Sequence, residues 1–206
     1  MDTGLPPDIE SLERQLDDAE RDARTILEGL DDAMGGWRPA PGSWSVAECL
    51  DHLATANRVY LEAMRAPAEE ALAQGRLRRG PATPGMLGRL FVRSLEPTTT
   101  MKTRAPKKIR PRGAPPLADA AARFHESQDR VRAFLRAYKG IDLAGVTFPN
   151  PFLPGVRFSL ATGLHVITAH ERRHLQQARR VREGAEAAMP RETPASTDGR
   201  RPEPRV

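Results

Sequence analysis

The sequence predicts an all-α protein: a four-helix bundle with a long, basic, proline-rich connection between its second and third helices. Apolar residues recur with helical spacing in four separate stretches of the chain. Candidate capping residues precede three of these stretches. We find no strand pattern and no internal repeat, so the four stretches are expected to pack on one another as a bundle.

The first helix is predicted by apolar residues that run from Ile9 to Leu30 with charged residues between them. Asp8, which follows two prolines, is the expected N-cap. Residues 1–7 are expected to be a flexible end. Gly35 and Gly36 are expected to end this helix, because glycine is common just past a helix C-terminus.

A capping box predicts the start of the second helix. Ser45 is followed three residues later by Glu48, so each side chain can bond the backbone of the other. The apolar stripe then continues to Met64. Trp44 precedes the cap, at a position that often packs back onto the first helical turn, here near Cys49.

The connection over residues 76–116 interrupts the helical pattern. Prolines forbid a long helix here, although residues 86–95 can form a short one. Eleven Lys and Arg residues against one acid lie between Arg76 and Arg112, a balance of +10. Because the whole chain carries +5, the remainder carries −5. Such a segment can bind nucleic acid, but it lacks a series of interleaved aromatics on which bases stack, which makes nucleic acid an unfavoured partner.

Two further helices complete the predicted bundle. The third covers residues 117–138, and the fourth runs from Leu160 to about Arg182 with Ser159 as its cap. Between them, residues 146–156 form an apolar, proline-rich stretch that is expected to be a loop over one end of the bundle. We therefore assign residues 8–183 to one bundle domain and residues 184–206, rich in Pro, Arg, Glu, Thr and Ser, to a disordered tail.

Composition points to a cytoplasmic protein. The 206 residues suffice for one domain, with 39% hydrophobic and 29% charged residues as in soluble proteins. No stretch approaches the roughly 20 apolar residues that span a bilayer, so no membrane partner is expected. The acidic N-terminus does not resemble a secretory signal. The single cysteine, Cys49, fits a reducing compartment.

Three histidines form the candidate metal site. His170 and His174 are four residues apart in a predicted helix, so their rings point the same way and suit one metal ion. On spacing alone, two surface histidines in a basic helix are the commoner arrangement. His52 on the second helix has small neighbours that leave room for a ligand, although a lone histidine there is more often a packing residue. His165 lies on the opposite side of the helix from His174, and His125 is predicted to be solvated.

Two motifs carry a resemblance to a known family. Residues 44–53 read WSVAECLDHL and residues 170–177 read HERRHLQQ. They resemble the "WS-x-x-E-x-x-x-HL" helix and the late "H-x-x-x-H-x-x-Q" helix of the DinB-like superfamily of metal-dependent bundle proteins. The resemblance covers roughly residues 10–182. It implies an up-down-down-up bundle, commonly a homodimer, that binds zinc, nickel or a similar ion through His52, His170 and His174.

The resemblance also implies a class of reaction. Characterised relatives include transferases and isomerases that use low-molecular-weight bacterial thiols such as bacillithiol or mycothiol. The chain is therefore expected to be a metal-dependent enzyme of the thiol S-transferase or isomerase type with a small-molecule substrate. Arginines of the basic connection can hold the carboxylates of an anionic thiol. The long basic connection is a departure from the simplest family members.

Two alternatives stay open. Three neutral ligands leave a coordination position for water, so the same ion can serve a metal-dependent hydrolase. The third reading is a non-catalytic, stress-related binding module with a structural metal. Glu171 or Glu48 can orient a ligand histidine through its second nitrogen; for Glu48 the role of helix cap is favoured.

Overall fold

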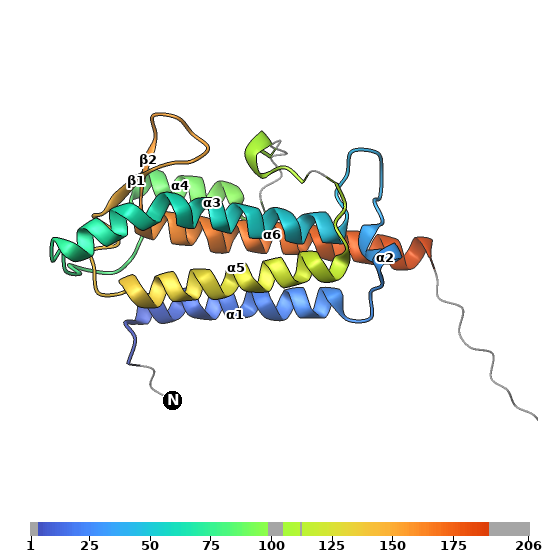
Figure 1. Cartoon of the computed structure of the whole chain (residues 1–206), viewed down its shortest axis with the longest axis horizontal. Helices are drawn as coiled ribbons and strands as arrows, with labels where there is room; N and C mark the ends of the chain where they lie inside the picture. Colours follow the sequence, from blue (N-terminus) through green and yellow to red (C-terminus); the bar gives the residue numbers. More distant parts are fainter. Residues whose placement is uncertain (1–3, 99–104, 112, 190–206) are drawn as a thin grey trace, which may run out of the picture.

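The computed structural model describes residues 4–98, 105–111 and 113–189. Four long helices make a bundle (Figure 1), in which α3 contacts α5 and α6, and α1 contacts the same two helices. The helices and strands, in chain order, are α1 (Pro7–Leu27), α2 (Asp32–Gly36), α3 (Val46–Ala73), α4 (Met86–Leu95), the 3-10 turn η1 (Lys107–Ile109), α5 (Leu117–Tyr138), β1 (Thr147–Pro149), β2 (Arg157–Ser159) and α6 (Leu160–Ala188). The prediction of a helical bundle is thus confirmed.

The first helix is shorter than predicted. It ends at Leu27, and Gly35 and Gly36 instead close the separate short helix α2. The reason is Asp31, whose side chain accepts a hydrogen bond from the amide of Met34 and so starts a new helix. The pair of glycines therefore marks a true helix end, but the end of a different helix.

The predicted N-cap of α1 is also wrong. The cap position is Pro6, without a side-chain hydrogen bond. Asp8 lies within the first turn, and its carboxylate accepts hydrogen bonds from the Arg78 guanidinium and the Ala82 amide, both at 2.6 Å. Asp8 thereby fastens α1 to the start of the basic connection.

The capping box of α3 is present as predicted. The Ser45 hydroxyl accepts from the Glu48 amide, and the Glu48 carboxylate accepts from the Ser45 amide. Glu48 also accepts two hydrogen bonds from Arg38, each 2.8 Å long. The helix continues through Pro67 to Ala73, beyond the apolar stripe that ends at Met64 in the sequence.

The basic connection is partly folded onto the bundle. Its predicted short helix is present as α4, which packs on α6. Gly88 allows this close approach, because a Cβ there would lie 2.5 Å from Oγ1 of Thr162. Beyond α4, Glu96 pairs with Arg172 of α6 through two hydrogen bonds. Residues 99–104 and 112 lie outside the described part of the chain.

The apolar stretch before α6 is not a plain loop. It contains β1 and leads directly into β2, and the two strands pair in antiparallel register with Phe148 opposite Phe158. Both rings are buried in the core at this end of the bundle. Our expectation of no strand was therefore wrong, because two strands of three residues each, one ending in proline, are too short to show an alternating pattern.

The last helix is longer than predicted. α6 continues past Arg182 to Ala188, and the Trp37 ring packs against it at Gly184, where a Cβ would lie 3.0 Å from the ring. The first residues of the predicted tail are thus helical, and residues 190–206 lie outside the described chain. Among the described helices, none has the length and apolar character needed to cross a membrane.

Contacts between the ends of the elements fix how they run. Leu77, just after α3, forms a β-bridge with Ile141, just after α5. At the other end, the amide of Leu117 at the start of α5 donates a hydrogen bond to the Asp32 carboxylate in α2. In the chain, α2 is the helix before α3. The chain just after α3 therefore lies against the chain just after α5, and α2 lies against the start of α5.

Candidate metal centre

The three candidate histidines come together inside the bundle. His52 projects from α3, and His170 and His174 project from successive turns of α6. One side-chain nitrogen of each lies within 4.8 Å of the others, and the ring centroids are 4.5–4.8 Å apart. His52 is 1% exposed. Among the described residues, this is the cluster whose ligand atoms are close enough to hold one metal ion.

Hydrogen bonds determine which nitrogen of His52 faces the cluster. Nδ1 of His52 lies 2.7 Å from the main-chain oxygen of Ile109. Because a carbonyl oxygen can only accept, Nδ1 carries the hydrogen and Nε2 keeps its lone pair. That Nε2 lies 3.1 Å from Nε2 of His170. The lone pair of His52 therefore points into the cluster.

His174 is held in the same way by a residue of its own helix. Its Nδ1 lies 3.0 Å from Oε1 of Gln177, one turn further along α6. With that oxygen accepting, Nδ1 of His174 carries the hydrogen and Nε2 is left free to bind. Gln177 is the last residue of the second sequence motif. Its hydrogen bond to His174 gives a physical reason for a glutamine at that position.

Electrostatics keep the three rings neutral. Burial, with the nearby His174 and His52, holds the pKa of His170 well below its ordinary value. Burial and the neighbouring His52 lower the pKa of His174 to about 3. Burial also lowers the pKa of His52, against the opposing effect of the hydrogen bond to Ile109. Neutral imidazole is the form that binds a metal, so the donor set fits a divalent ion.

The Trp44 side chain forms one wall of the cluster. Its ring stacks on His174 with centroids 5.5 Å apart and lies 4.7 Å from the ring of His52. The sequence placed Trp44 against the first turn of the helix, but gave no sign of contact with the histidines. The Ile109 carbonyl was missed altogether, because it lies in a proline-rich connection 57 residues from its partner.

Glu171, the candidate for orienting a ligand histidine, makes its hydrogen bonds elsewhere. It is fully buried, and its Oε1 accepts from the side-chain amides of Asn57 and Gln128, both at 2.7 Å. Asn57 also donates to the Ser127 hydroxyl. Burial raises the pKa of Glu171 to about 7, although both amides lower it. These contacts link α6 to α3 and α5, while Glu48 serves as cap and ion-pair partner of Arg38.

The remaining histidines and the cysteine lie outside the cluster. Nε2 of His165 lies 3.1 Å from the carbonyl oxygen of Ala82 and so ties α6 to the connection. His125 is half-buried, with Nδ1 3.4 Å from the Glu20 carboxylate. Cys49 is buried, and burial raises the pKa of its thiol. His165 and His125 therefore lie outside the group of three histidines, as the sequence predicts.

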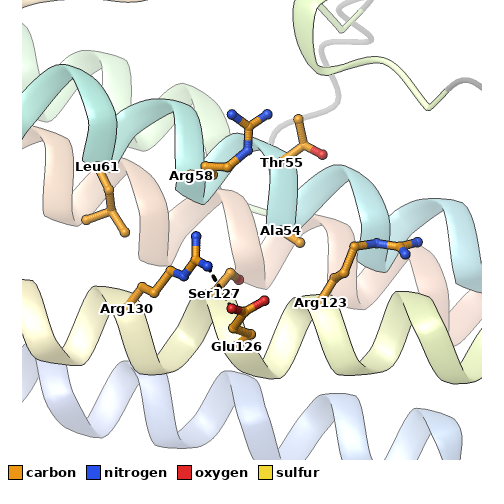
Figure 2. Close-up of a pocket in the computed structure, with 8 residues that line it drawn as sticks. All are labelled: Ala54, Thr55, Arg58, Leu61, Arg123, Glu126, Ser127 and Arg130. Carbon is orange, nitrogen blue, oxygen red and sulfur yellow. Dashed lines mark hydrogen bonds and ion pairs between the residues drawn. The ribbon is translucent and has the colours of Figure 1, made fainter.

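A pocket on the surface between α3 and α5 does not include the histidines (Figure 2). Its rim carries three arginines, and each is already engaged by a carboxylate at 2.7–2.9 Å. The pairs are Arg58 with Glu62, Arg123 with Asp51, and Arg130 with Glu126. Each arginine of the pocket is therefore already paired with a carboxylate.

Comparison with known proteins identifies one family. The family model of the DinB superfamily matches residues 15–178, a span that includes α3, α5 and all three histidines of the cluster. No curated protein and no solved structure matches the chain.

Proposed function

The chain belongs to the DinB superfamily, and we propose that it is a metal-dependent enzyme that holds a divalent ion through His52, His170 and His174. The observation that carries the proposal is a group of three neutral imidazoles, one buried and two partly buried, in which the free nitrogens of His52 and His174 face the cluster. Imidazole suits zinc and nickel, the ions that we favour. Three protein ligands would leave a position for a substrate, as in catalytic sites.

We assign the reaction to the thiol S-transferase or isomerase type. A bound divalent ion supplies Lewis acidity, which favours a thiolate or a hydroxide at neutral pH. The chain's one cysteine cannot supply that thiol, because Cys49 is buried with a raised pKa. We therefore propose that a low-molecular-weight thiol from solution is the nucleophile.

The basic connection favours an anionic thiol. Lys107, Lys108 and Arg110 are exposed and flank Ile109, whose carbonyl contacts His52. These three residues lie within two positions of the residue that contacts His52, and we propose that their side chains pair with the carboxylates of a substrate. Hydrolysis remains the alternative for the same residues, and a non-catalytic module with a structural metal is the third possibility.

An activity comparison separates these functions. The zinc- or nickel-loaded protein is supplied with a low-molecular-weight thiol plus an electrophile, and separately with a panel of amides and esters. We expect turnover of the thiol pair, lost in His174→Ala and retained in His165→Ala. Turnover of amides or esters alone would replace the transferase by a hydrolase, and no turnover of either would favour the binding module.

We also propose the domain and its helix order. Residues 8–183 form one bundle with residues 76–116 as an insertion, in up-down-down-up order. The order is supported by the Leu77–Ile141 bridge at one end and the Leu117–Asp32 hydrogen bond at the other, since both contacts are expected when α3 and α5 run the same way. The homodimer and the cytoplasmic location stay predictions, which light scattering and fractionation test.

A further inference from the structure

We infer that Ile109 is a positioning residue for the metal centre. Its buried side chain anchors the basic connection on α3, so that its carbonyl holds His52 with Nδ1 protonated and Nε2 turned to the cluster. The inference goes beyond the proposed function by making the basic connection part of the site. It rests on the proposed function only where it concerns metal affinity.

The anchor is an isolated apolar contact in a polar segment. Ile109 is 4% exposed and packs with Ala56 and Val59 of α3, with Phe152 against them. Its neighbours Lys108 and Arg110 are exposed. The Ile109 side chain is therefore what fixes this part of the connection to the bundle.

The local backbone is shaped to present the carbonyl. Ile109 ends the one-turn helix η1, and its amide donates to the Pro106 carbonyl at 3.1 Å. The Arg110 guanidinium donates to the Ala105 carbonyl at 2.9 Å and closes the turn. Pro106 restricts the backbone before the turn and Pro111 after it. With its own amide bonded inside the turn, Ile109 directs its carbonyl to Nδ1 of His52.

The contact decides the chemistry of His52 because a neutral imidazole has one protonated nitrogen. The partner of that nitrogen selects the tautomer, and here the partner is an obligate acceptor. For His174 the equivalent partner is Gln177, three residues further along the same helix, so the helix geometry alone brings the two side chains together. For His52 the partner is 57 residues away, so its position depends on the anchor.

The test uses the full-length, metal-free protein and four chains: wild type, Ile109→Ala, Ile109→Val and Lys108→Ala. Long-range proton–nitrogen NMR spectra report the tautomer of His52, and chelator competition with zinc reports metal affinity. Circular dichroism verifies the fold of each variant. Ile109→Val keeps a branched apolar anchor, and Lys108→Ala changes an exposed neighbour in the same turn.

We expect wild type, Ile109→Val and Lys108→Ala to show His52 protonated at Nδ1. In Ile109→Ala we expect a mixture of tautomers and zinc affinity reduced roughly ten- to hundredfold, as when a partner behind a ligand histidine is lost. The inference is overturned if Ile109→Ala keeps both the wild-type tautomer of His52 and the wild-type zinc affinity. It is also overturned if His52 is protonated at Nε2 in the wild type, a result that does not depend on whether the variants fold. If the wild type binds no zinc, the proposed function fails, while the tautomer measurement still decides this inference.

Discussion

Nε2 of His52 lies 3.1 Å from Nε2 of His170, although the two residues are 118 positions apart in the chain. Because Nδ1 of His52 is committed to the Ile109 carbonyl, the hydrogen between the two Nε2 atoms belongs to His170 in the metal-free protein. A cation between the rings would be attracted by both lone pairs once His170 adopts its other tautomer. The contact is thus the place where the candidate ligand of α3 meets a candidate ligand of α6.

The Asp8 carboxylate gives a prediction about pH. Burial alone would raise the pKa of Asp8, but hydrogen bonds from Arg78 and from the Ala82 amide outweigh it and hold the pKa below its ordinary value. A carboxyl with a lowered folded-state pKa stabilises the fold above its unfolded pKa, about 3.9, and loses this contribution as pH falls through the folded value.

We therefore expect Asp8→Asn to reduce the free energy of unfolding by about 1–2 kcal/mol at neutral pH, within the range for hydrogen bonds to a charged group at a partly exposed site. Urea unfolding at several pH values measures the difference in unfolding free energy, which should shrink as the pH falls through the lowered folded-state pKa of Asp8. A loss of unfolding free energy in Asp8→Asn that does not change with pH would show that the charge of Asp8 is not its cause. Asp17→Asn serves as the exposed control.

The buried network around Glu171 predicts a second pair of effects. Asn57→Ala removes the donor shared by Ser127 and Glu171, and we expect a loss of about 2–3 kcal/mol because buried partners are left without hydrogen bonds. Glu171→Gln keeps an oxygen that can accept from Asn57 and Gln128, so we expect a smaller loss and unchanged metal affinity. Thermal unfolding and chelator competition measure both. A large drop in metal affinity for Glu171→Gln would restore Glu171 as an orienting residue.

The contact of α4 with α6 predicts the effect of a single methyl group. In Gly88→Ala the new Cβ meets the Thr162 side chain at 2.5 Å, so we expect overpacking to cost about 1–3 kcal/mol, less the gain in helix propensity. Combining it with Thr162→Ala should recover part of the loss. Gly80→Ala is the control, since nothing lies within 4 Å of its added Cβ. Equal stability of Gly88→Ala and wild type would show that α4 does not pack this closely.

Local signals explain which parts of the fold were predictable. The capping box at Ser45 and the Ser159 cap both mark helix starts where they were predicted, because capping depends on residues within one turn. Asp31 carries the same kind of signal, which was overlooked in favour of the glycine pair that follows it. The β1–β2 pairing escaped prediction because strands of three residues are too short to show an alternating pattern.

The candidate site likewise has residues that the sequence could identify and residues that it could not. His170 and His174 could be paired from helical spacing, and His52 joined them through the resemblance of its motif. The partner of His174, Gln177, was visible in that motif at a spacing of one turn. Ile109 had no local signal, because its role depends on where a proline-rich connection folds back. Residues close in sequence could be placed, and residues joined only by the tertiary fold could not.

The most direct test of the account is the metal content of the purified protein. Elemental analysis after loading with zinc or nickel and removal of excess ion should give one ion per chain in the wild type and in His165→Ala, whose histidine lies on the same helix outside the cluster. His170→Ala should lose the ion while keeping its helical circular dichroism spectrum. One tightly held ion per chain in a variant with His52, His170 and His174 all replaced by alanine would contradict the account.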